Sequence, residues 1–355
     1  MISAEIVADS RSPHGDRLTS LLITFPRFIL AEINTHRMLS KNTSSSRAIP
    51  FKKMVEAVQE NPFIPIAWQK HHSGMQGSEY LEPPFHEDGV LLWIEARDSA
   101  VKQAQELYEY GITKQLANRL LEPFMWTTML ITGSKEGWDN FFELRCPQYR
   151  PVDITYKSKR DAIENEDFED VFEESDTLGW LSINEGQAEI HIMDLAEKIY
   201  DAMNESIPKQ LEAGEWHIPM LDKIPFVGNL VKYVDVNNTH WKDYDEQNKV
   251  KISTALGART SYTVVGDEKE IDYERMINLH DRLIEMRHDS PLEHCAKAMD
   301  DSEYQSYIKG MLTELNPERD FNENIEIEEP LHKEKGWCRN FKGFIQYRHI
   351  VETNK

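Results

Sequence analysis

The sequence lacks any long apolar run, and this absence excludes a membrane-spanning helix. A span needs about 20 consecutive apolar residues, whereas runs such as Leu21–Ile23 and Phe28–Leu30 are only a few residues long. The first residues, Met1–Glu5, also lack the basic region and apolar stretch of a secretion signal. We therefore expect a protein of the cytoplasm with no membrane partner.

Cysteine is scarce as well. The 355 residues include 3 cysteines, Cys146, Cys295 and Cys338, which lie far apart in the sequence and form no CxxC pair. This spacing argues against a disulfide framework and against a zinc knuckle. We expect reduced thiols and no metal site.

Positive charge is in the minority. The chain has 40 Lys and Arg residues against 62 Asp and Glu residues, a formal net charge of −22. A field of this sign repels polyanions at long range, so duplex nucleic acid is not an expected partner. A small phosphorylated ligand is still compatible with this charge, because a few local arginines suffice to bind one phosphate.

What is present suits a globular protein of about two domains, with 40% hydrophobic and 10% aromatic residues. Two β-like runs, Ile2–Ala8 and Leu18–Phe25, are joined by a segment with the composition of a turn and predict a β-hairpin. Apolar residues at helical spacing predict helices over 28–37, 93–121, 138–144, 186–208 and 271–286. We interpret the remaining distinct stretches as loops or solvated insertions: 40–47, 60–90, the acidic run 160–178 and 220–250, with 300–330 ambiguous.

Several common catalytic signatures are missing. The chain has no GxGxxG, GxxxxGK[ST], HExxH or GxSxG motif, so a dinucleotide fold, a P-loop, a zincin and an α/β-hydrolase have no support. Instead, Thr35–Arg47 concentrates hydroxyl groups, a histidine and two arginines after a predicted helix. These donors are what a phosphate or oxyanion site needs. The alternative is a Ser/Thr-rich surface loop with helix caps.

Thr35–Arg47 resembles the RHRxxSxNExSxR signature of the flavin-dependent thymidylate synthases. The matching residues are His36, Arg37, Ser40, Asn42, Ser45 and Arg47. Other family elements are similar to Asn118–Pro123, Phe141–Arg145 and Gln187–Ile190, and two more are similar to Ala258–Tyr262 (ARTSY) and His288–His294 (HDSPLEH). In the family the last two elements precede the signature, whereas here they follow it.

This order suggests a circular permutation or the relocation of a segment. A site can be built from the same pieces in any chain order, provided that the linkers reach. The resemblance implies an α+β fold like that of flavin-dependent thymidylate synthase, with insertions. We expect a synthase-like core over 1–220 and a relocated segment over 221–355, packed into the same domain.

The resemblance also implies the reaction: reductive methylation of dUMP to dTMP at C5 by a homo-oligomer, with FAD as cofactor and NADPH and methylenetetrahydrofolate as co-substrates. The implied FAD contacts are Ser261, His288, Ser290, His36 and Arg37. The implied contacts to the pyrimidine deoxynucleotide monophosphate are Glu32, Thr43, Ser45, Arg47 and Arg145. Arg145 and His36 are the implied catalytic residues.

Three departures from the signature leave alternatives open. Thr35 replaces its first Arg, Glu32 replaces a Gln, and Thr43 replaces a Glu. The changes at Glu32 and Thr43 would suit a hydroxymethyltransferase acting on dUMP or dCMP, and the lost Arg would suit a catalytically silent flavin- or nucleotide-binding protein. Cys146, beside Arg145, is a minor candidate for a nucleophile of lowered pKa.

Overall fold

The computed structural model describes residues 1–73, 77–150, 153–165, 173, 176–221, 237, 239–262, 271–315, 333–334, 337–338 and 341–353. The strands are β1 (Ser3–Arg11), β2 (Arg17–Pro26), β3 (Ser40–Thr43), β4 (Trp126–Ser134), β5 (Lys209–Gln210), β6 (Trp216–His217), β7 (Ala296–Ala298), β8 (Lys333–Glu334), β9 (Trp337–Cys338) and β10 (Phe344–Gln346). The α-helices are α1 (Leu30–Asn34), α2 (Phe51–Glu60), α3 (Phe85–Glu109), α4 (Lys114–Ala117), α5 (Lys135–Arg145), α6 (Lys159–Glu164), α7 (Thr177–Ser182), α8 (Ile190–Glu205), α9 (Glu246–Arg259), α10 (Tyr273–Glu285), α11 (Asp301–Leu315) and α12 (Tyr347–Thr353). Short 3₁₀ segments are η1 (Arg27–Ile29), η2 (Asn118–Phe124), η5 (Trp241–Asp243), η6 (Thr260–Tyr262) and η7 (Ser290–Glu293).

A five-stranded sheet of order β3-β4-β2-β1-β5 forms the centre of the molecule. The predicted hairpin is confirmed, because β1 and β2 pair antiparallel from Ser3–Thr24 to Arg11–Arg17. The same sheet extends on the other side of β2, where β4 pairs antiparallel along the whole of β2. Side chains alternate between the two faces of a strand, so the sheet offers two surfaces that need cover.

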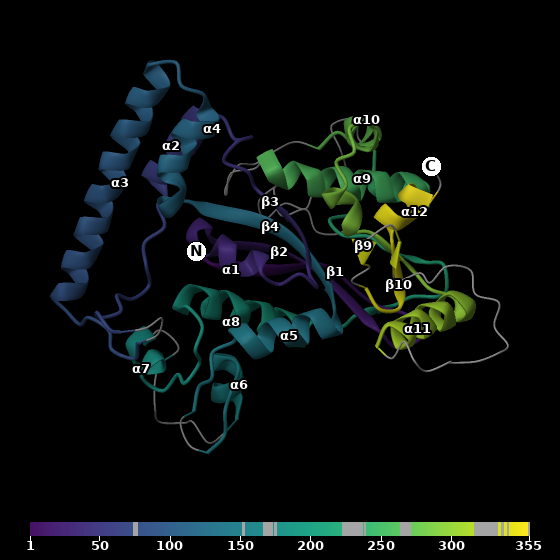
Figure 1. Ribbon diagram of the computed structural model, residues 1–355, viewed down its shortest axis with the longest axis horizontal. Coiled ribbons are helices and arrows are strands. Elements are labelled where there is room, and N and C mark those ends of the chain that lie inside the picture. The colour runs from purple at the N-terminus through teal and green to yellow at the C-terminus, as the bar shows by residue number, and fades with distance from the viewer. Residues whose placement is uncertain are drawn as a thin grey trace.

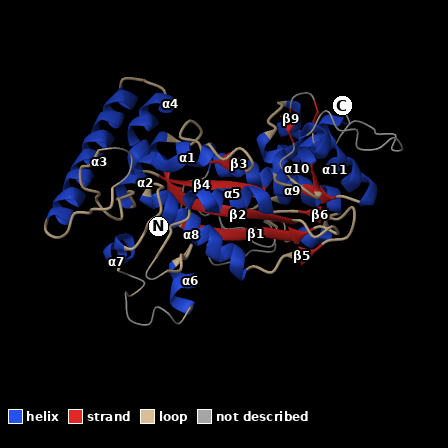
Figure 2. Ribbon diagram, turned by 60° about the horizontal axis from the view of Figure 1, so that its bottom comes forward, coloured by secondary structure: helices blue, strands red, loops and turns tan. Residues whose placement is uncertain are grey.

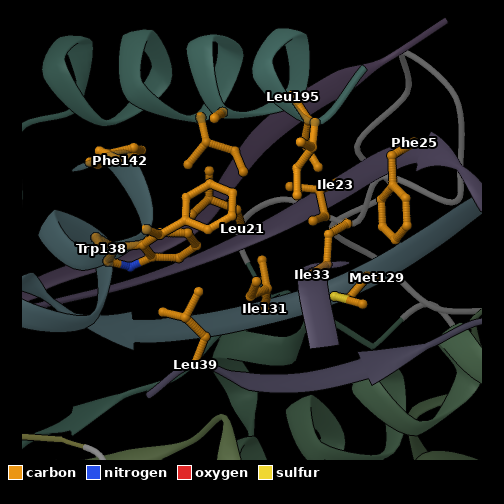
Figure 3. Packing of buried hydrophobic residues seen from close by; sticks show 14 of the residues in the cluster. Leu21, Ile23, Phe25, Ile33, Leu39, Met129, Ile131, Trp138, Phe142 and Leu195 are labelled. Atoms are coloured by element: carbon orange, nitrogen blue, oxygen red, sulfur yellow. The ribbon is translucent and has the colours of Figure 1, made fainter. Parts of the chain in front are cut away.

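One face of the sheet is covered by α5 and α8. Leu21, Ile23 and Phe25 of β2 are fully buried there with Trp138 of α5 and Leu195 of α8 (Figure 3). The predicted helix over 138–144 is confirmed as α5, and the one over 186–208 as the shorter α8. Their apolar faces pack on the sheet, as the 3.6-residue period requires.

The opposite face is covered by the C-terminal part of the chain. Leu22 of β2 and Leu130 of β4 share a core with Ile252 and Leu256 of α9 and Met276 of α10. Figures 1 and 2 show the sheet between these two helical layers. The α+β fold expected from the motifs is confirmed, and the predicted helix over 271–286 is present as α10.

A second, three-stranded sheet joins distant parts of the chain in the order β10-β7-β6. Its residues Ala296 and Phe344 pack with Leu18 of β2 and with Phe341, which precedes β10. Residues after 220 therefore cover one face of the main sheet and also form two strands of the smaller sheet, β7 and β10. The division into 1–220 and 221–355 stays our interpretation of the motif order.

The predicted helix over 93–121 is wrong as one continuous element. The helix α3 begins at Phe85 and ends at Glu109, and α4 and η2 follow after a break. At the break, Gly111 has φ = +83°, a conformation that glycine adopts without steric cost and other residues rarely adopt. The apolar spacing continues across this break because α4 and η2 pack on α3, so periodicity alone missed it.

The interpretation of 40–47 as a loop is also wrong in part. Ser40–Thr43 form β3, an edge strand that pairs antiparallel with β4. A polar sequence can form a strand here because Ser40 and Asn42 turn inward, 2% and 6% exposed, and are hydrogen-bonded. The flanking residues Thr43 and Lys41 are half-buried.

Other expected irregular stretches are only partly described. Within the acidic run 160–178, α6 precedes residues that lie outside the described ranges, and 220–250 and 300–330 also contain such residues. The described parts of those stretches include the start of α9 and most of α11. No helix in the described ranges has both the length and the hydropathy needed to span a bilayer.

Candidate functional site

The elements predicted to form one site come together at β3. The Asn42 side chain donates a hydrogen bond to the Gly257 carbonyl oxygen, next to the ARTSY element. The Ser45 backbone N–H donates to the Ser261 carbonyl oxygen at 3.0 Å, and the Ser290 hydroxyl donates to the Asn42 amide oxygen at 3.4 Å. Both relocated elements therefore lie directly against the signature loop.

A second contact joins the start of this loop to the end of α5. The Arg145 guanidinium donates through Nε to His36 Nε2 at 3.0 Å and reaches Thr35 Oγ1 at 3.5 Å. The Phe141 ring packs edge-on against the His36 ring, with centroids 4.9 Å apart. The two residues expected to be catalytic are thus hydrogen-bonded to each other.

His36 is neutral in this setting. Burial, together with the positive charges of Arg145 and Lys41, lowers the pKa of His36 to about 4. Because Nε2 accepts from Arg145, the neutral ring carries its proton on Nδ1. His36 therefore acts on Arg145 as a hydrogen-bond acceptor that orients the guanidinium.

The turn between α1 and β3 has a cation of its own. Lys41 donates through Nζ to the Leu39 carbonyl oxygen at 2.9 Å and to the His36 carbonyl oxygen. Burial lowers the pKa of Lys41 to about 8, and the nearby Glu293 carboxylate partly offsets this effect. Sequence reasoning missed Lys41, because it occupies an unspecified position of the signature.

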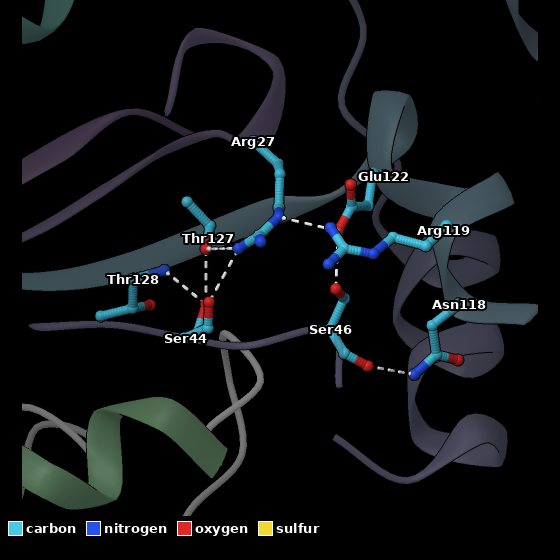
Figure 4. Close-up of polar contacts among 8 residues, drawn as sticks. All are labelled: Arg27, Ser44, Ser46, Asn118, Arg119, Glu122, Thr127 and Thr128. Carbon is cyan, nitrogen blue, oxygen red and sulfur yellow. Dashed lines mark hydrogen bonds and ion pairs between the residues drawn. The ribbon is translucent and has the colours of Figure 1, made fainter. Parts of the chain in front are cut away.

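A partly buried ionic cluster fixes the second half of the loop (Figure 4). Arg27 donates to the Ser44 carbonyl oxygen at 2.7 Å and forms an ion pair with Glu122 at 3.3 Å. Glu122 also accepts from the Ser46 hydroxyl at 2.6 Å and from Arg119 at 2.9 Å. Glu122 and Arg119 belong to the Asn118–Pro123 element, so this family resemblance could have indicated the contact with the loop.

Most of the side chains predicted to bind ligand are accessible. Arg37, Arg47, His288 and Ser290 are exposed, while Ser45, Ser261, Thr43 and Arg145 are half-buried. Arg47 also donates to the Gln115 side chain at 3.3 Å. The accessible guanidinium groups, imidazole and hydroxyls form a donor set suited to phosphate oxygens, and this set fits a phosphate-bearing cofactor such as FAD.

Glu32 differs from these donors. Its Oε2 atom is buried without a hydrogen-bond partner among the described residues, although the residue as a whole is half-buried. A carboxylate oxygen in this state has unused acceptor capacity. Glu32 therefore has an acceptor atom that no described group uses.

The hypothesis that Cys146 is a nucleophile of lowered pKa is wrong. Its thiol is free and buried, and burial raises the pKa of Cys146 instead of lowering it. The Arg145 guanidinium is turned toward His36 and Thr35. The position of Cys146 beside Arg145 in the sequence therefore predicted the wrong direction for the shift of its pKa.

A chain of buried polar groups runs across neighbouring strands of the main sheet, between His217 and His294. His217 of β6 bonds to Ser10 at 2.9 Å and to Ser20 at 2.8 Å. Ser20 bonds to Thr132 at 2.6 Å, and Thr132 bonds to His294 at 2.8 Å. Burial lowers the pKa of His217 to about 4 and that of His294 to about 3, so both rings are neutral at pH 7.

A cavity of about 410 Å³ lies apart from this cluster, at the N-terminus of α8. Glu189 lines it and caps the helix, accepting from the backbone N–H groups of His191 and Ile192 and from the His191 ring. None of the predicted site residues lines this cavity. Its wall residue Asn184 accepts from the Gln148 N–H, three positions after Arg145.

The geometry can now be compared with known proteins. The family model Thy1, thymidylate synthase complementing protein, matches residues 17–158. This match covers less than half of the chain. The Thy1 segment contains the signature loop, the Asn118–Pro123 element and Arg145, whereas Ser261, His288 and Ser290 lie outside it.

Two solved structures of a UMP/dUMP methylase PolB from Streptomyces cacaoi are similar to this chain. The one bound with 5-Br UMP has 17% identity and a TM-score of 0.40, covering 58% of this chain and 89% of its own. The one bound with 5-Br dUMP has 16% identity and a TM-score of 0.35, covering 45% of this chain and 85% of its own. No curated protein matches the chain.

Proposed function

We propose that this protein transfers a one-carbon unit to C5 of a pyrimidine deoxynucleotide monophosphate, most specifically in the reductive methylation of dUMP to dTMP. The proposal is carried by one observation: Ser261 and Ser290, from the relocated elements, lie against Ser45 and Asn42 of the signature loop. Two parts of the family signature that are distant in the chain thus form one surface.

In this proposal, the exposed side chains of the signature loop and of the two relocated elements bind the two anionic ligands. Ser261, Ser290, His288 and Arg37 would hold FAD, which supplies hydride transfer when bound. His36 would act through Arg145, because its ring accepts from that guanidinium.

The nucleotide phosphate would lie against Ser45, Arg47 and Arg145. Their hydroxyl and guanidinium groups donate to phosphate oxygens, and a planar guanidinium can bind two of these oxygens at once. The protein's contribution to the reaction is then to orient the ligands and to polarise the pyrimidine carbonyls. NADPH and methylenetetrahydrofolate would be the co-substrates.

A cytosine nucleotide is the second candidate, favoured by Glu32. The partnerless Oε2 atom of Glu32 can accept from the exocyclic amine of cytosine, and the Thr43 hydroxyl can donate or accept. A pocket that hydrogen-bonds its substrate discriminates strongly, since the wrong base leaves buried polar groups unpaired. dUMP ranks first because the family model that matches residues 17–158 is that of thymidylate synthase complementing protein.

The deciding experiment is the mass of the product. The purified protein is incubated with FAD, NADPH and methylenetetrahydrofolate together with dUMP or dCMP. Formation of dTMP from dUMP supports the proposal, and a hydroxymethylated product, or turnover of dCMP alone, replaces it with the second candidate. An absorbance titration that shows FAD binding without any product would indicate a silent binding protein.

We also propose that the protein works as a symmetric homo-oligomer in the cytoplasm. A homo-oligomer lets ligand groups from neighbouring subunits meet at a shared boundary. Size-exclusion chromatography with light scattering measures this state, and a monomer that methylates dUMP would contradict it.

A further inference from the structure

The signature loop lacks a cation at its first position. Thr35 stands there, and its hydroxyl donates to the Glu32 carbonyl oxygen at 2.6 Å. The nearest described guanidinium contact to this hydroxyl comes from Arg145, which also serves His36. A site that must hold two anionic ligands therefore has one positive charge fewer on this turn.

Lys41, in β3, places a positive charge on the same turn. Its ammonium group bonds to the carbonyl oxygens of His36 and Leu39, so it closes the segment that contains Arg37. These bonds end on neutral carbonyl groups, not on a carboxylate. The carboxylate that acts on Lys41 electrostatically, Glu293, is itself paired with Arg348 at 2.6 Å.

We propose that Lys41 replaces the missing arginine, supplying the positive charge of the turn and holding the His36–Leu39 segment so that Arg37 faces the ligand phosphates. Lys41 is a positioning residue, because it acts through backbone carbonyl groups. This inference rests on the proposed function, since it concerns the same ligand site.

The charged groups around Lys41 give this role a pH signature. His36 on the turn, with its pKa of about 4, is already neutral at pH 7. The other charged groups on the neighbouring elements are Arg145 from α5 and Arg348 from α12, which is paired with Glu293 from η7. Lys41, with a pKa of about 8, is charged below that pH and neutral above it. Anion affinity should therefore fall as the pH rises from 7 to 9.

The test measures FAD affinity by flavin fluorescence across pH 7–9 on the full-length protein. It compares the wild type with Lys41→Arg, Lys41→Met and the double variant Thr35→Arg/Lys41→Met. Lys102→Met, at an exposed position of α3, is the matched control. We expect Lys41→Met to weaken FAD binding about tenfold at pH 7 and to abolish the decline toward pH 9.

Lys41→Arg should keep the affinity and also lose the decline, because arginine stays protonated at pH 9. The double variant should recover part of the lost affinity, since the cation returns to position 35 but the bonds to the His36 and Leu39 carbonyl oxygens do not. Thermal melts check that each variant is folded, and Lys41→Arg tests the charge even if Lys41→Met unfolds.

Three results would overturn the inference: equal affinity and pH profile in Lys41→Met and wild type, a wild-type-like decline in Lys41→Arg, or no recovery in the double variant. Absence of FAD binding by the wild type counts against the proposed function instead. The two failures are therefore distinguishable.

Discussion

Replacing Glu122 with glutamine tests the ionic cluster that holds the signature loop. The Glu122 carboxylate is the common acceptor for Arg27, Arg119 and Ser46. Glutamine keeps the shape of the side chain but removes its charge. Arg27, whose side chain is 11% exposed, then remains inside the protein without its counter-ion.

The expected loss can be worked out from these contacts. Removing one partner of a buried ion pair costs about 3–5 kcal/mol. The Glu122 side chain is 23% exposed and Arg27 keeps its bond to the Ser44 carbonyl oxygen, so the cost is reduced. Arg119 is about half exposed and adds little. We expect Glu122→Gln to lower the free energy of unfolding by about 2–3 kcal/mol.

Urea unfolding followed by circular dichroism measures this change. Asp139→Asn is the matched control, because it neutralises one carboxylate of an exposed i,i+4 pair with Lys135, and such a pair contributes about 0.3–0.5 kcal/mol. If Glu122→Gln unfolds at the same urea concentration as Asp139→Asn, the cluster does not stabilise the loop and the reasoning fails.

Three further changes test other parts of the structure. Arg47→Ala should weaken nucleotide binding by about one to two powers of ten while FAD affinity changes little; calorimetric titration with dUMP measures it, and equal affinity would remove Arg47 from the site. Trp138→Ala empties a fully buried position and should cost about 3–5 kcal/mol, whereas a cost below about 1 kcal/mol in urea unfolding would contradict the tight packing of α5 on the sheet. The folded-state pKa values of His217 and His294, about 4 and about 3, lie below the unfolded value of about 6.5. The unfolded state therefore binds more protons and stability falls as the pH drops from 6.5 toward 4, by about 3 kcal/mol for each ring; Ser20→Ala interrupts the chain between them as a comparison, and melting temperatures that stay constant from pH 7 to 4.5 would contradict buried neutral rings.

The elements predicted correctly from the sequence are those whose pattern is set locally. The β1–β2 hairpin has two β-like runs on either side of a turn-forming segment, and α8 and α10 have one apolar face each. β4 carries no such pattern, because both of its faces are buried and its residues are nearly all inaccessible. Strands covered on two sides lose the alternation that identifies them.

The errors at β3 and along α3 have different physical causes. β3 is polar because its inward side chains bond to distant partners, such as Asn42 to the Gly257 carbonyl oxygen, and tertiary contacts outweigh local propensity there. The end of α3 depends on the backbone conformation of Gly111. A single glycine inside an apolar pattern does not reveal that conformation.

The candidate site was predictable as a set of pieces but not as an arrangement. Resemblance named the signature loop, Arg145 and the two relocated elements. It gave no sign that Arg145 bonds to His36 or that Lys41 closes the turn. Such contacts depend on how helices and strands pack, and the order of motifs along the chain carries no information about them.

The contact between Asn42 and Gly257 joins residues 215 positions apart along the chain. At about 5–20 residues per second, a ribosome completes the signature loop at least about 10 seconds before it makes α9, whose Gly257 carbonyl oxygen accepts from Asn42. Over that interval the growing chain presents the loop without its partners Gly257, Ser261 and Ser290, although the β1–β2 hairpin can already pair. Ligand affinity would therefore arise late in synthesis, after the sheet has started to form, and a chain truncated before α9 would carry the signature without the geometry that makes it a site.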